Sequence, residues 1–365
     1  MLPKIKTKIR SHIDAVKYYV AHKHVPNEKD GTRKVLFLDI RYNAFGRYLY
    51  LFLKFFHMEG YTVYMPKDLK LIRQLQCNSF TASLIQEKIV NFGIPPFAGN
   101  MITIDKKRLS ADYFSGIANA AASGNIYVPM SQHPLMYFNG WWNTPLEEGK
   151  RKRSLFMAGN FDPRGYSKLD VFNVMPRMVM YSYLEKRKLL YNIEDQERML
   201  SFLDSEEDGK IILVDRLKFD VPIWHMRWLL SRFEFYFALP GTVMPLCHNI
   251  IEAMSAGAIP FMQEEYARLF TPVLENGVHA ITFRDENDLE LRLNETLQLS
   301  PEKISFMRER MAAYYQEYLT PRSVVNRIEK PGQNNKIYLQ AEEGSVKLFK
   351  KNHEQGIKKI LSHRS

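Results

Sequence analysis

The sequence is poor in cysteine and has no long uninterrupted hydrophobic run. Cys77 and Cys247 are the only cysteines among 365 residues, and neither belongs to a Cys-x-x-Cys motif. Two such residues supply neither a disulfide framework nor the ligands of a structural zinc site. The longest apolar candidate, residues 48–58, is interrupted by Lys54, whereas a membrane span needs about 20 apolar residues. With no signal-peptide pattern at the N-terminus, we expect a cytoplasmic protein without a transmembrane helix.

Several sequence signatures of catalysis are also absent. The chain contains no Walker A motif, no Gly-x-Gly-x-x-Gly after a strand, no His-Glu-x-x-His and no Gly-x-Ser-x-Gly. This argues against P-loop NTPases, dinucleotide oxidoreductases, zinc proteases and α/β-hydrolases. An Asp-x-Asp pair is missing as well. We therefore expect neither a metal nor a cofactor. Helix N-termini and basic side chains would supply the positive charge that a divalent cation supplies in other enzymes.

The charge of the chain is strongly positive. A net charge of +11 predicts an anionic partner, and much of it lies near the two ends. Residues 1–20 and 346–364 both combine apolar residues at helical spacing with lysines and arginines on the other faces. Such helices either lie on an anionic membrane surface or pack their apolar stripe on the protein. No nucleic-acid recognition motif is present, so we expect no nucleic-acid partner. The apolar stripe of the first helix comprises Ile5, Ile9, Ile13, Val16 and Val20.

Apolar, strand-like segments alternate with helical ones twice along the chain. The first series begins at residues 35–40 and the second at residues 154–159. A stretch rich in proline, glycine and aromatic residues, 131–153, separates them. This alternation predicts an α/β protein with two doubly wound parallel sheets. We expect a basic N-terminal helix at 1–30, a first domain at 31–145, a second domain at 150–330 and a basic tail at 331–365.

One carboxylate stands inside an apolar helix of the second domain. The predicted strand 233–239 ends at Pro240-Gly241, and its loop leads into a helix at 249–256 that contains Glu252. Ligands of parallel sheets bind beyond the carboxyl ends of the strands, where helix N-termini attract phosphate. Gly241 and Thr242 would let backbone amides approach a phosphate. Glu252, with His248 on the same helix face, would accept hydrogen bonds from the two hydroxyls of a ribose. The alternative is the solvent face of an ordinary amphipathic helix.

Residues 230–270 resemble the donor-binding segment of the exostosin-like glycosyltransferases, and more loosely that of other GT-B enzymes. The shared pattern is a strand ending at a Pro-Gly turn, a helix with an acid followed by alanine, and then Gly-x-x-Pro, here Gly257 to Pro260. The resemblance implies a GT-B fold, with two Rossmann-like doubly wound domains facing a central cleft. The domain at 31–145 would bind the acceptor, and the domain at 150–330 would bind the nucleotide-sugar donor. It also implies that Glu252 binds the nucleotide ribose, while Gly241, Thr242 and the helix start hold the diphosphate. The family usually has an arginine three residues before the acid, where this chain has Asn249.

Four further residues are candidates for the site. Gly159 and Arg164 lie in the loop after the first strand of the second domain and would contact the donor phosphates; the alternative is a surface turn. Asp39 ends the first strand of the N-terminal domain and would deprotonate an acceptor hydroxyl; the alternative is an ion pair with Arg41 or Arg47. His133 is a second candidate base, or else a packed loop residue.

Together with these patterns, the resemblance implies a metal-independent glycosyltransferase. It would move a sugar from a nucleotide sugar to a glycan or lipid-linked acceptor, in the synthesis of bacterial surface polysaccharide or lipopolysaccharide. Its basic ends would keep it at the inner face of the membrane. Two alternatives remain open: a catalytically inactive glycan-binding or scaffold subunit of the same fold, and a basic nucleic-acid-binding protein.

Overall fold

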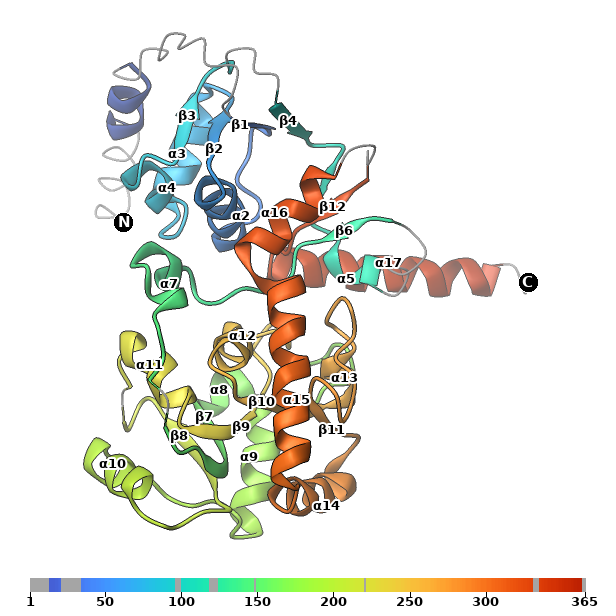
Figure 1. The fold of residues 1–365 in the computed structure, drawn as a ribbon. Coiled ribbons are helices and arrows are strands. Elements are labelled where there is room, and N and C mark those ends of the chain that lie inside the picture. The colour runs from blue at the N-terminus through green and yellow to red at the C-terminus, as the bar shows by residue number, and fades with distance from the viewer. Residues whose placement is uncertain are drawn as a thin grey trace, which may run out of the picture. The chain divides into compact units, whose positions relative to one another are not determined.

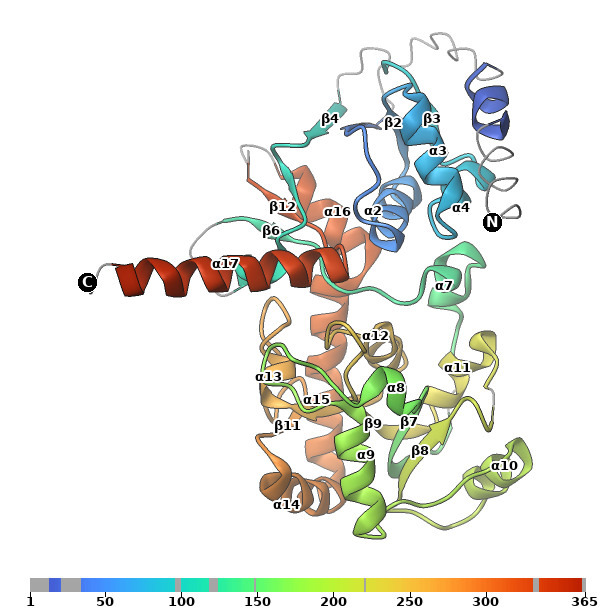
Figure 2. The same cartoon turned by 180° about the vertical axis from the view of Figure 1, so that it is seen from behind.

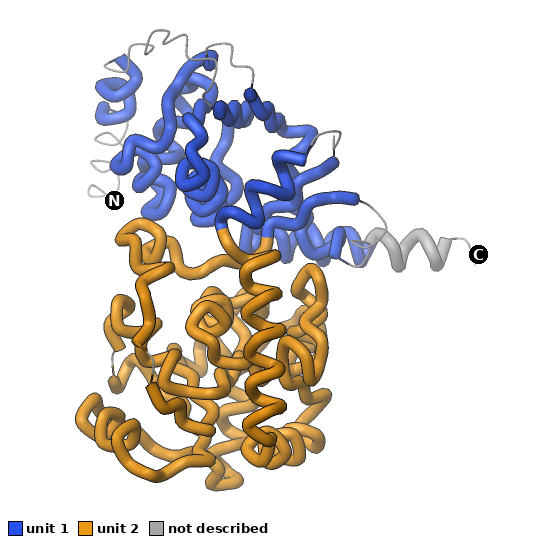
Figure 3. The backbone as a smooth tube through the Cα atoms, in the orientation of Figure 1, with its two compact units in different colours: residues 1–128, 321–365 blue, residues 129–320 orange. Residues whose placement is uncertain are grey.

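The structure is a computed structural model that describes residues 13–20, 34–95, 100–117, 124–147, 149–219, 221–330 and 335–362, with side chains to residue 354. The chain divides into two compact units (Figure 3). Unit 1 comprises Met1–Val128 and Pro321–Ser365, and unit 2 comprises Pro129–Thr320. Each unit has its own parallel sheet and is described separately.

The main sheet of unit 1 has four parallel strands in the order β3-β2-β1-β4 (Figure 1). They are β1 (Lys34–Asp39), β2 (Tyr61–Met65), β3 (Val90–Phe92) and β4 (Asn100–Asp105). Three of the six residues of β1 are fully buried, as expected for an inner strand covered on both faces. The chain places β2 and β3 on one side of β1 and β4 on the other. The carboxyl ends of β1 and β4 therefore flank a topological switch point, where Asp39 pairs in register with Asp105.

The helices of unit 1 connect and cover these strands. Between β1 and β4 the chain forms α2 (Arg47–Met58), α3 (Leu69–Cys77) and α4 (Ala82–Gln86). Gly46, which precedes α2, has a positive φ of 52°, a conformation that glycine adopts without steric cost. Eight of the twelve residues of α2 are buried, so this helix provides much of the core of unit 1.

The C-terminal segment of the chain returns to unit 1. Helix α16 (Pro321–Glu329) packs on α2, and Glu329 accepts hydrogen bonds from Tyr61 at 2.6 Å and Lys34 at 2.7 Å. Strand β12 (Ile337–Tyr338) lies between β5 (Leu109–Ser110) and β6 (Ile126–Tyr127) in a second, three-stranded parallel sheet. Helix α17 (Glu343–Ser362) packs on α5 (Tyr113–Ile117).

Unit 2 is built on five parallel strands in the order β11-β10-β9-β7-β8. They are β7 (Lys152–Gly159), β8 (Ile211–Asp215), β9 (Phe233–Phe237), β10 (Ile259–Gln263) and β11 (Ile281–Phe283). Numbered along the chain, this is the 2-1-3-4-5 order of flavodoxin-like sheets, whose switch point lies between the first and third strands, here β7 and β9. A buried aromatic core holds these two strands together: Phe156 of β7 stacks on Phe233 of β9 at 4.6 Å between ring centroids.

Helices cover both faces of the unit 2 sheet. Figures 1 and 2 show α9 (Arg177–Lys186) and α15 (Pro301–Tyr314) on opposite faces. Helix α12 (His248–Ser255) packs against α11 (Ile223–Leu230), β10 and α15, and so lies on the α15 face. The other α-helices described in unit 2 are α7 (Pro134–Phe138), α8 (Pro163–Tyr166), α10 (Gln196–Asp204), α13 (Glu264–Ala267) and α14 (Glu286–Leu297).

The predicted fold class is confirmed, because both units are α/β structures with parallel, Rossmann-like sheets. The observed division of the chain differs from the predicted domain ranges. Residues 129–145 join unit 2, since the His133 backbone donates to Glu252 and Gln132 donates to Tyr315. Residues 321–365 join unit 1 through α16, β12 and α17 and are not a separate tail.

The helix expected after β7 is much shorter than its apolar pattern suggests. The apolar pattern of residues 168–191 predicts one long helix, whereas α9 begins at Arg177 and ends at Lys186. Phe172 and Asn173 have positive φ angles, which a right-handed helix does not contain. Pro176 then precedes the helix as its N-cap residue. This late start places Arg177 in the first position of α9.

The basic N-terminal helix lies only partly within the described residues. Residues 13–20 are helical, and the exposed fractions of Ile13, Val16 and Val20 are 47%, 37% and 68%. Ala15 is buried, and the Tyr18 ring contacts Phe92. Here the predicted apolar stripe faces solvent; Ile5 and Ile9 lie outside the described residues. In the part of the chain that the structure describes, we find no helix with the length and hydropathy of a membrane span.

Candidate functional site

The first turn of α12 lies at the switch point of unit 2 and is hydrogen-bonded to β7. Asn249, the second residue of α12, donates from Nδ2 to the Ala158 carbonyl of β7 at 3.2 Å. The Cys247 backbone N–H, just before the helix, donates to the Tyr266 hydroxyl at 3.0 Å. These bonds hold the N-terminus of α12 beside the carboxyl end of β7. Asn249 therefore has a defined structural contact at the position where the resembled family usually has arginine.

Glu252 lies one turn inside α12 and is not on a solvent face. Only 3% of its surface is exposed. Its Oε1 atom accepts the His133 backbone N–H at 3.0 Å and contacts His248 Nδ1 at 2.9 Å. Its Oε2 atom makes no hydrogen bond with any described residue. The carboxylate is thus anchored through Oε1, and Oε2 can accept a hydrogen bond from a ligand.

The electrostatic surroundings keep Glu252 ionised. Burial by itself raises the pKa of this carboxyl, but the charge and hydrogen bond of His248 and the backbone N–H of His133 outweigh it, so the net pKa is lowered. An ionised carboxylate only accepts hydrogen bonds, so His248 carries a proton on Nδ1. In the neutral imidazole, Nε2 of His248 is then an acceptor.

His133 has the opposite tautomer from the one that a general base needs at Nε2. It is the N-cap of α7, and its Nδ1 atom accepts the Leu135 backbone N–H at 3.2 Å. The neutral ring with this contact carries its proton on Nε2. Its ring meets that of His248 edge to face, 4.9 Å between centroids. His133 anchors Glu252 through its backbone N–H, and its role as a catalytic base stays a prediction.

The Pro-Gly turn after β9 has its own structural reason for glycine. The Gly241 N–H donates to the Pro245 carbonyl at 3.0 Å, so it is not available to a phosphate. A Cβ at this position would lie 2.6 Å from the Met244 carbonyl oxygen. Gly241 is therefore required by the folding of the loop on itself. Thr242 next to it is exposed.

Arg164 forms a surface turn in the structure. Its side chain is 91% exposed and pairs with Asp162 at 2.9 Å. Asp162 is also the N-cap of α8, accepting the Arg164 backbone N–H at 3.0 Å. Gly159 ends β7, and a Cβ there would lie 2.5 Å from Met157 Cε and 3.0 Å from Arg177 Nη1. Glycine at 159 thus makes room for a buried arginine.

That arginine is not among the residues predicted from the sequence. Arg177 is 3% exposed, and it donates from Nε to the Pro240 carbonyl at 3.1 Å and from Nη1 to the Asn160 carbonyl at 2.7 Å. It therefore joins the segments that follow β7 and β9. Burial raises the pKa of Tyr236 on β9, and the nearby charge of Arg177 lowers it while that of Glu252 raises it, so both charges act on one phenol. No local sequence pattern marks Arg177, because its partners are distant in sequence.

In unit 1, Asp39 lies at the carboxyl end of β1, beside the switch point. It is partly buried, and its side chain makes no hydrogen bond or ion pair with any described residue. Arg47, one expected partner, forms its ion pair with Glu342. The described residues therefore do not show the ion pair with Arg41 or Arg47 that was the structural alternative for Asp39.

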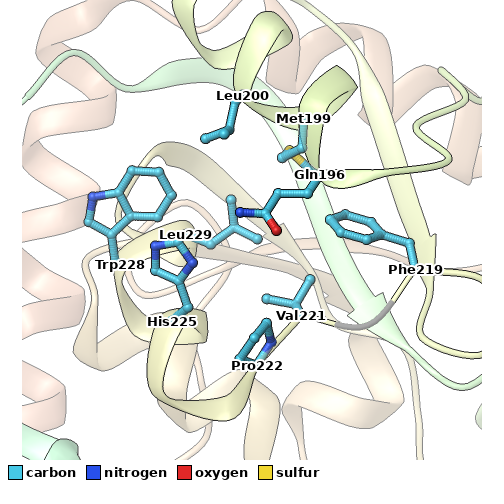
Figure 4. A pocket seen from close by; sticks show the side chains of 9 residues that line it. All are labelled: Gln196, Met199, Leu200, Phe219, Val221, Pro222, His225, Trp228 and Leu229. Atoms are coloured by element: carbon cyan, nitrogen blue, oxygen red, sulfur yellow. The ribbon is translucent and has the colours of Figure 1, made fainter.

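Two other features of the described residues bear on the site. Within them, no group of three or more His, Cys, Asp or Glu side chains is arranged to hold a metal ion. An apolar pocket in unit 2 lies between α10, α11 and the preceding loop, with His225 stacked on Trp228 at 4.5 Å (Figure 4). None of the candidate residues lines this pocket.

Comparison with known proteins gives structural similarity alone. The chain matches no family model and no curated protein. Anabaena HepE, solved with UDP and glucose, is 10% identical, with 81% of this chain and 98% of HepE covered and a TM-score of 0.41. A point mutant of S. aureus TarM, solved with fondaparinux, α-GlcNAc-glycerol and UDP, is 8% identical, with 73% of this chain and 54% of TarM covered and a TM-score of 0.35. WaaG, a glycosyltransferase involved in lipopolysaccharide biosynthesis, is 11% identical, with 82% and 100% covered and a TM-score of 0.29. Similarity at this level does not identify the chain.

Proposed function

We propose that this protein is a glycosyltransferase of the GT-B type that binds its nucleotide-sugar donor in unit 2. The observation that carries the proposal is Glu252: an ionised, buried carboxylate, one turn inside the helix that begins at the switch point of a parallel sheet. Burying a charged carboxylate costs several kcal/mol of folding free energy unless hydrogen bonds, an opposite charge or a bound ligand offset it. Its Oε2 oxygen, which accepts no hydrogen bond from a described residue, suits a ligand with hydroxyl groups, such as a ribose.

The edge of the sheet provides the rest of a donor site. The α12 N-terminus carries a partial positive charge equivalent to about half an elementary charge, which attracts phosphate. During transfer the nucleoside diphosphate leaves with added negative charge, and fixed dipoles stabilise that charge without reorganisation. The reaction therefore needs no metal ion in this scheme.

For the acceptor, we assign unit 1 and its residue Asp39. If the transfer inverts the anomeric centre, a carboxylate at the carboxyl end of β1 takes the proton of the attacking hydroxyl. The resemblance of residues 230–270 to exostosin-like enzymes favours a glycan or lipid-linked acceptor and a role in bacterial surface polysaccharide or lipopolysaccharide synthesis. The exposed apolar residues Ile13, Val16 and Val20, beside the basic residues of the same segment, favour attachment to the inner face of the membrane.

A thermal-unfolding panel with UDP-, GDP-, CMP- and dTDP-sugars tests the proposal. A ligand at about 100 times its dissociation constant adds about 2.7 kcal/mol to the free energy of unfolding, which shifts the melting temperature clearly. Glu252→Gln keeps the size of the side chain and an acceptor for the His133 N–H, but removes the charge. We expect it to fold and to lose most of the ligand-induced shift.

The controls separate binding from folding and from chemistry. Glu275→Gln, an exposed carboxylate of unit 2, should leave the shift unchanged. A panel in which no nucleotide sugar stabilises the wild-type chain contradicts the proposal. Stabilisation without any sugar transfer or donor hydrolysis would instead identify the inactive glycan-binding alternative.

A further inference from the structure

Arg177 is a buried cation without a carboxylate partner. It is 3% exposed, and it forms no ion pair with any described residue. Asp162, which lies in the β7–α8 loop, is paired with Arg164. A buried charge is normally paired, because removal from water costs several kcal/mol that attraction to an opposite charge must offset. The question is what balances this charge.

The protein satisfies only part of the guanidinium. A guanidinium has five N–H donors. One N–H of Nε donates to the Pro240 carbonyl, and one N–H of Nη1 donates to the Asn160 carbonyl. The other three N–H groups make no hydrogen bond to a described residue. The guanidinium carbon Cζ of Arg177 lies 4.1 Å from the centroid of the Tyr166 ring. This cation–π contact offsets some of the positive charge. The two carbonyls and the ring also fix the orientation of the planar group.

Arg151 is a useful comparison within the same sheet. It also donates to two carbonyls, those of Phe233 at 3.0 Å and Ala256 at 2.7 Å. Phe233 begins β9, so Arg151 lies at the amino end of the strand whose carboxyl end Arg177 contacts. The carboxylate of Glu234 lies close enough to Arg151 to act on its charge. Arg177 differs in lying at the edge where parallel sheets bind ligands.

We propose that Arg177 is the diphosphate-binding residue of unit 2, with its remaining N–H groups donating to phosphate oxygens of the nucleotide. This inference rests on the proposed function and names the cation that Arg164 does not supply. A planar guanidinium held in place binds phosphate through two parallel hydrogen bonds. The N-terminus of α12, tied to β7 by Asn249, adds its dipole at the same edge.

The same contact favours the transfer step. The bond between the anomeric carbon and the diphosphate oxygen breaks with both electrons remaining on that oxygen. The acceptor oxygen forms the new bond to the carbon, and its proton passes to the base. The diphosphate gains one negative charge in this step, so a fixed guanidinium stabilises the departing group more than the bound donor.

The experiment measures stabilisation by inorganic pyrophosphate, by UDP, GDP, CDP and dTDP, and by the corresponding nucleosides. It uses the full chain and its Arg177→Gln, Arg177→Lys and Arg151→Lys variants. Loss of hydrogen bonds to a charged group weakens binding about tenfold or more. We expect Arg177→Gln to weaken pyrophosphate and diphosphate binding by that factor, with nucleoside binding unchanged. Arg177→Lys keeps the charge but not the planar fork and should be intermediate.

Arg151→Lys is the matched control, because it removes carbonyl contacts of the same kind at the opposite edge. It should lower the melting temperature of the unliganded protein, as Arg177→Lys does, and leave the dissociation constants unchanged. Equal diphosphate affinity in wild type and Arg177→Gln overturns the inference while leaving the proposed function intact. Pyrophosphate binding that depends on Arg177, without binding of any nucleotide sugar, supports the inference and contradicts the proposed function. Absence of any phosphate binding to the wild-type chain overturns both.

Discussion

The two units place different chemistry at the same kind of position. Each has a parallel sheet whose strand order reverses next to its first strand, β1 in unit 1 and β7 in unit 2. In unit 1 the carboxyl edge carries the carboxylate of Asp39, without a described partner. In unit 2 the edge carries a buried cation, Arg177, and an ionised acid, Glu252. The topology thus provides the location, and the side chains decide what is bound there.

The difference extends to how firmly each group is held. Glu252 is anchored by a backbone N–H and an imidazole, and Arg177 by two carbonyls and a ring. Charged groups held in fixed orientation are suited to bind a ligand at low entropic cost. Asp39 has no comparable support among the described residues, which is compatible with a group that exchanges a proton.

The largest effect that we expect from the difference between the two units is on the rate of sugar transfer. Asp39→Asn removes the proposed base, and general base catalysis contributes about 10²- to 10⁴-fold, so kcat should fall by that factor. Donor affinity should stay the same, because the donor is bound by unit 2. The measurement is steady-state kinetics together with the donor-induced thermal shift.

Asp105→Asn is the matched control for this prediction. Asp105 faces Asp39 in register on β4, but it accepts the backbone N–H groups of Lys107 and Arg108, which an asparagine oxygen also does. Its kcat should remain near the wild-type value. An undiminished kcat in Asp39→Asn removes the catalytic role from unit 1.

A smaller effect is expected on the stability of unit 2 and its pH dependence. The pKa of Glu252 is lower in the folded than in the unfolded protein, so its contribution to stability is present above the unfolded pKa and disappears as pH falls through the folded pKa. His248→Ala removes a hydrogen bond to this charged group and should cost about 1.5–3 kcal/mol at pH 7. The difference from wild type should shrink below about pH 4. Urea unfolding at a series of pH values measures it.

A double-mutant cycle identifies the source of that effect. In the Glu252→Gln background the charge is already absent, so His248→Ala should cost less and show no acid-dependent change. An equal cost in both backgrounds would mean that His248 acts through packing and not through the carboxylate.

The smallest expected effect concerns the surface of unit 1. Val20→Asp places a charge on the exposed apolar stripe of residues 13–20, where Val20 is 68% exposed. If this stripe enters an anionic membrane, binding to vesicles that contain phosphatidylglycerol should weaken about tenfold, since burial of a valine is worth about 1.5 kcal/mol or more. Co-sedimentation with the full chain measures it. Leu217→Asp, at a 71% exposed position of unit 2, should have no effect, and equal weakening by both variants would exclude this stripe as the contact.

Much of the fold was predictable because its signals are local. Strands β1, β2, β7, β8, β9 and β10 all overlap apolar runs that predict them, with ends that differ by up to two residues. The Glu252 helix begins within one residue of its predicted start. Short or irregular elements were less accessible: β3 has only three residues, and the helix expected at 168–191 is shortened by Pro176 and two residues with positive φ. Local periodicity does not report such interruptions.

What the sequence alone determined is the alternation of strands and helices, the parallel sheets that follow from it, and the acid one turn inside the helix after β9. The tertiary structure decided how that acid is used and which arginine accompanies it. His133 meets Glu252 across 119 residues, and Arg177 meets Pro240 across 63. The physical reason is that secondary structure depends on neighbours within a few residues, whereas burial and hydrogen bonding depend on which distant segments the fold brings to the same edge of a sheet.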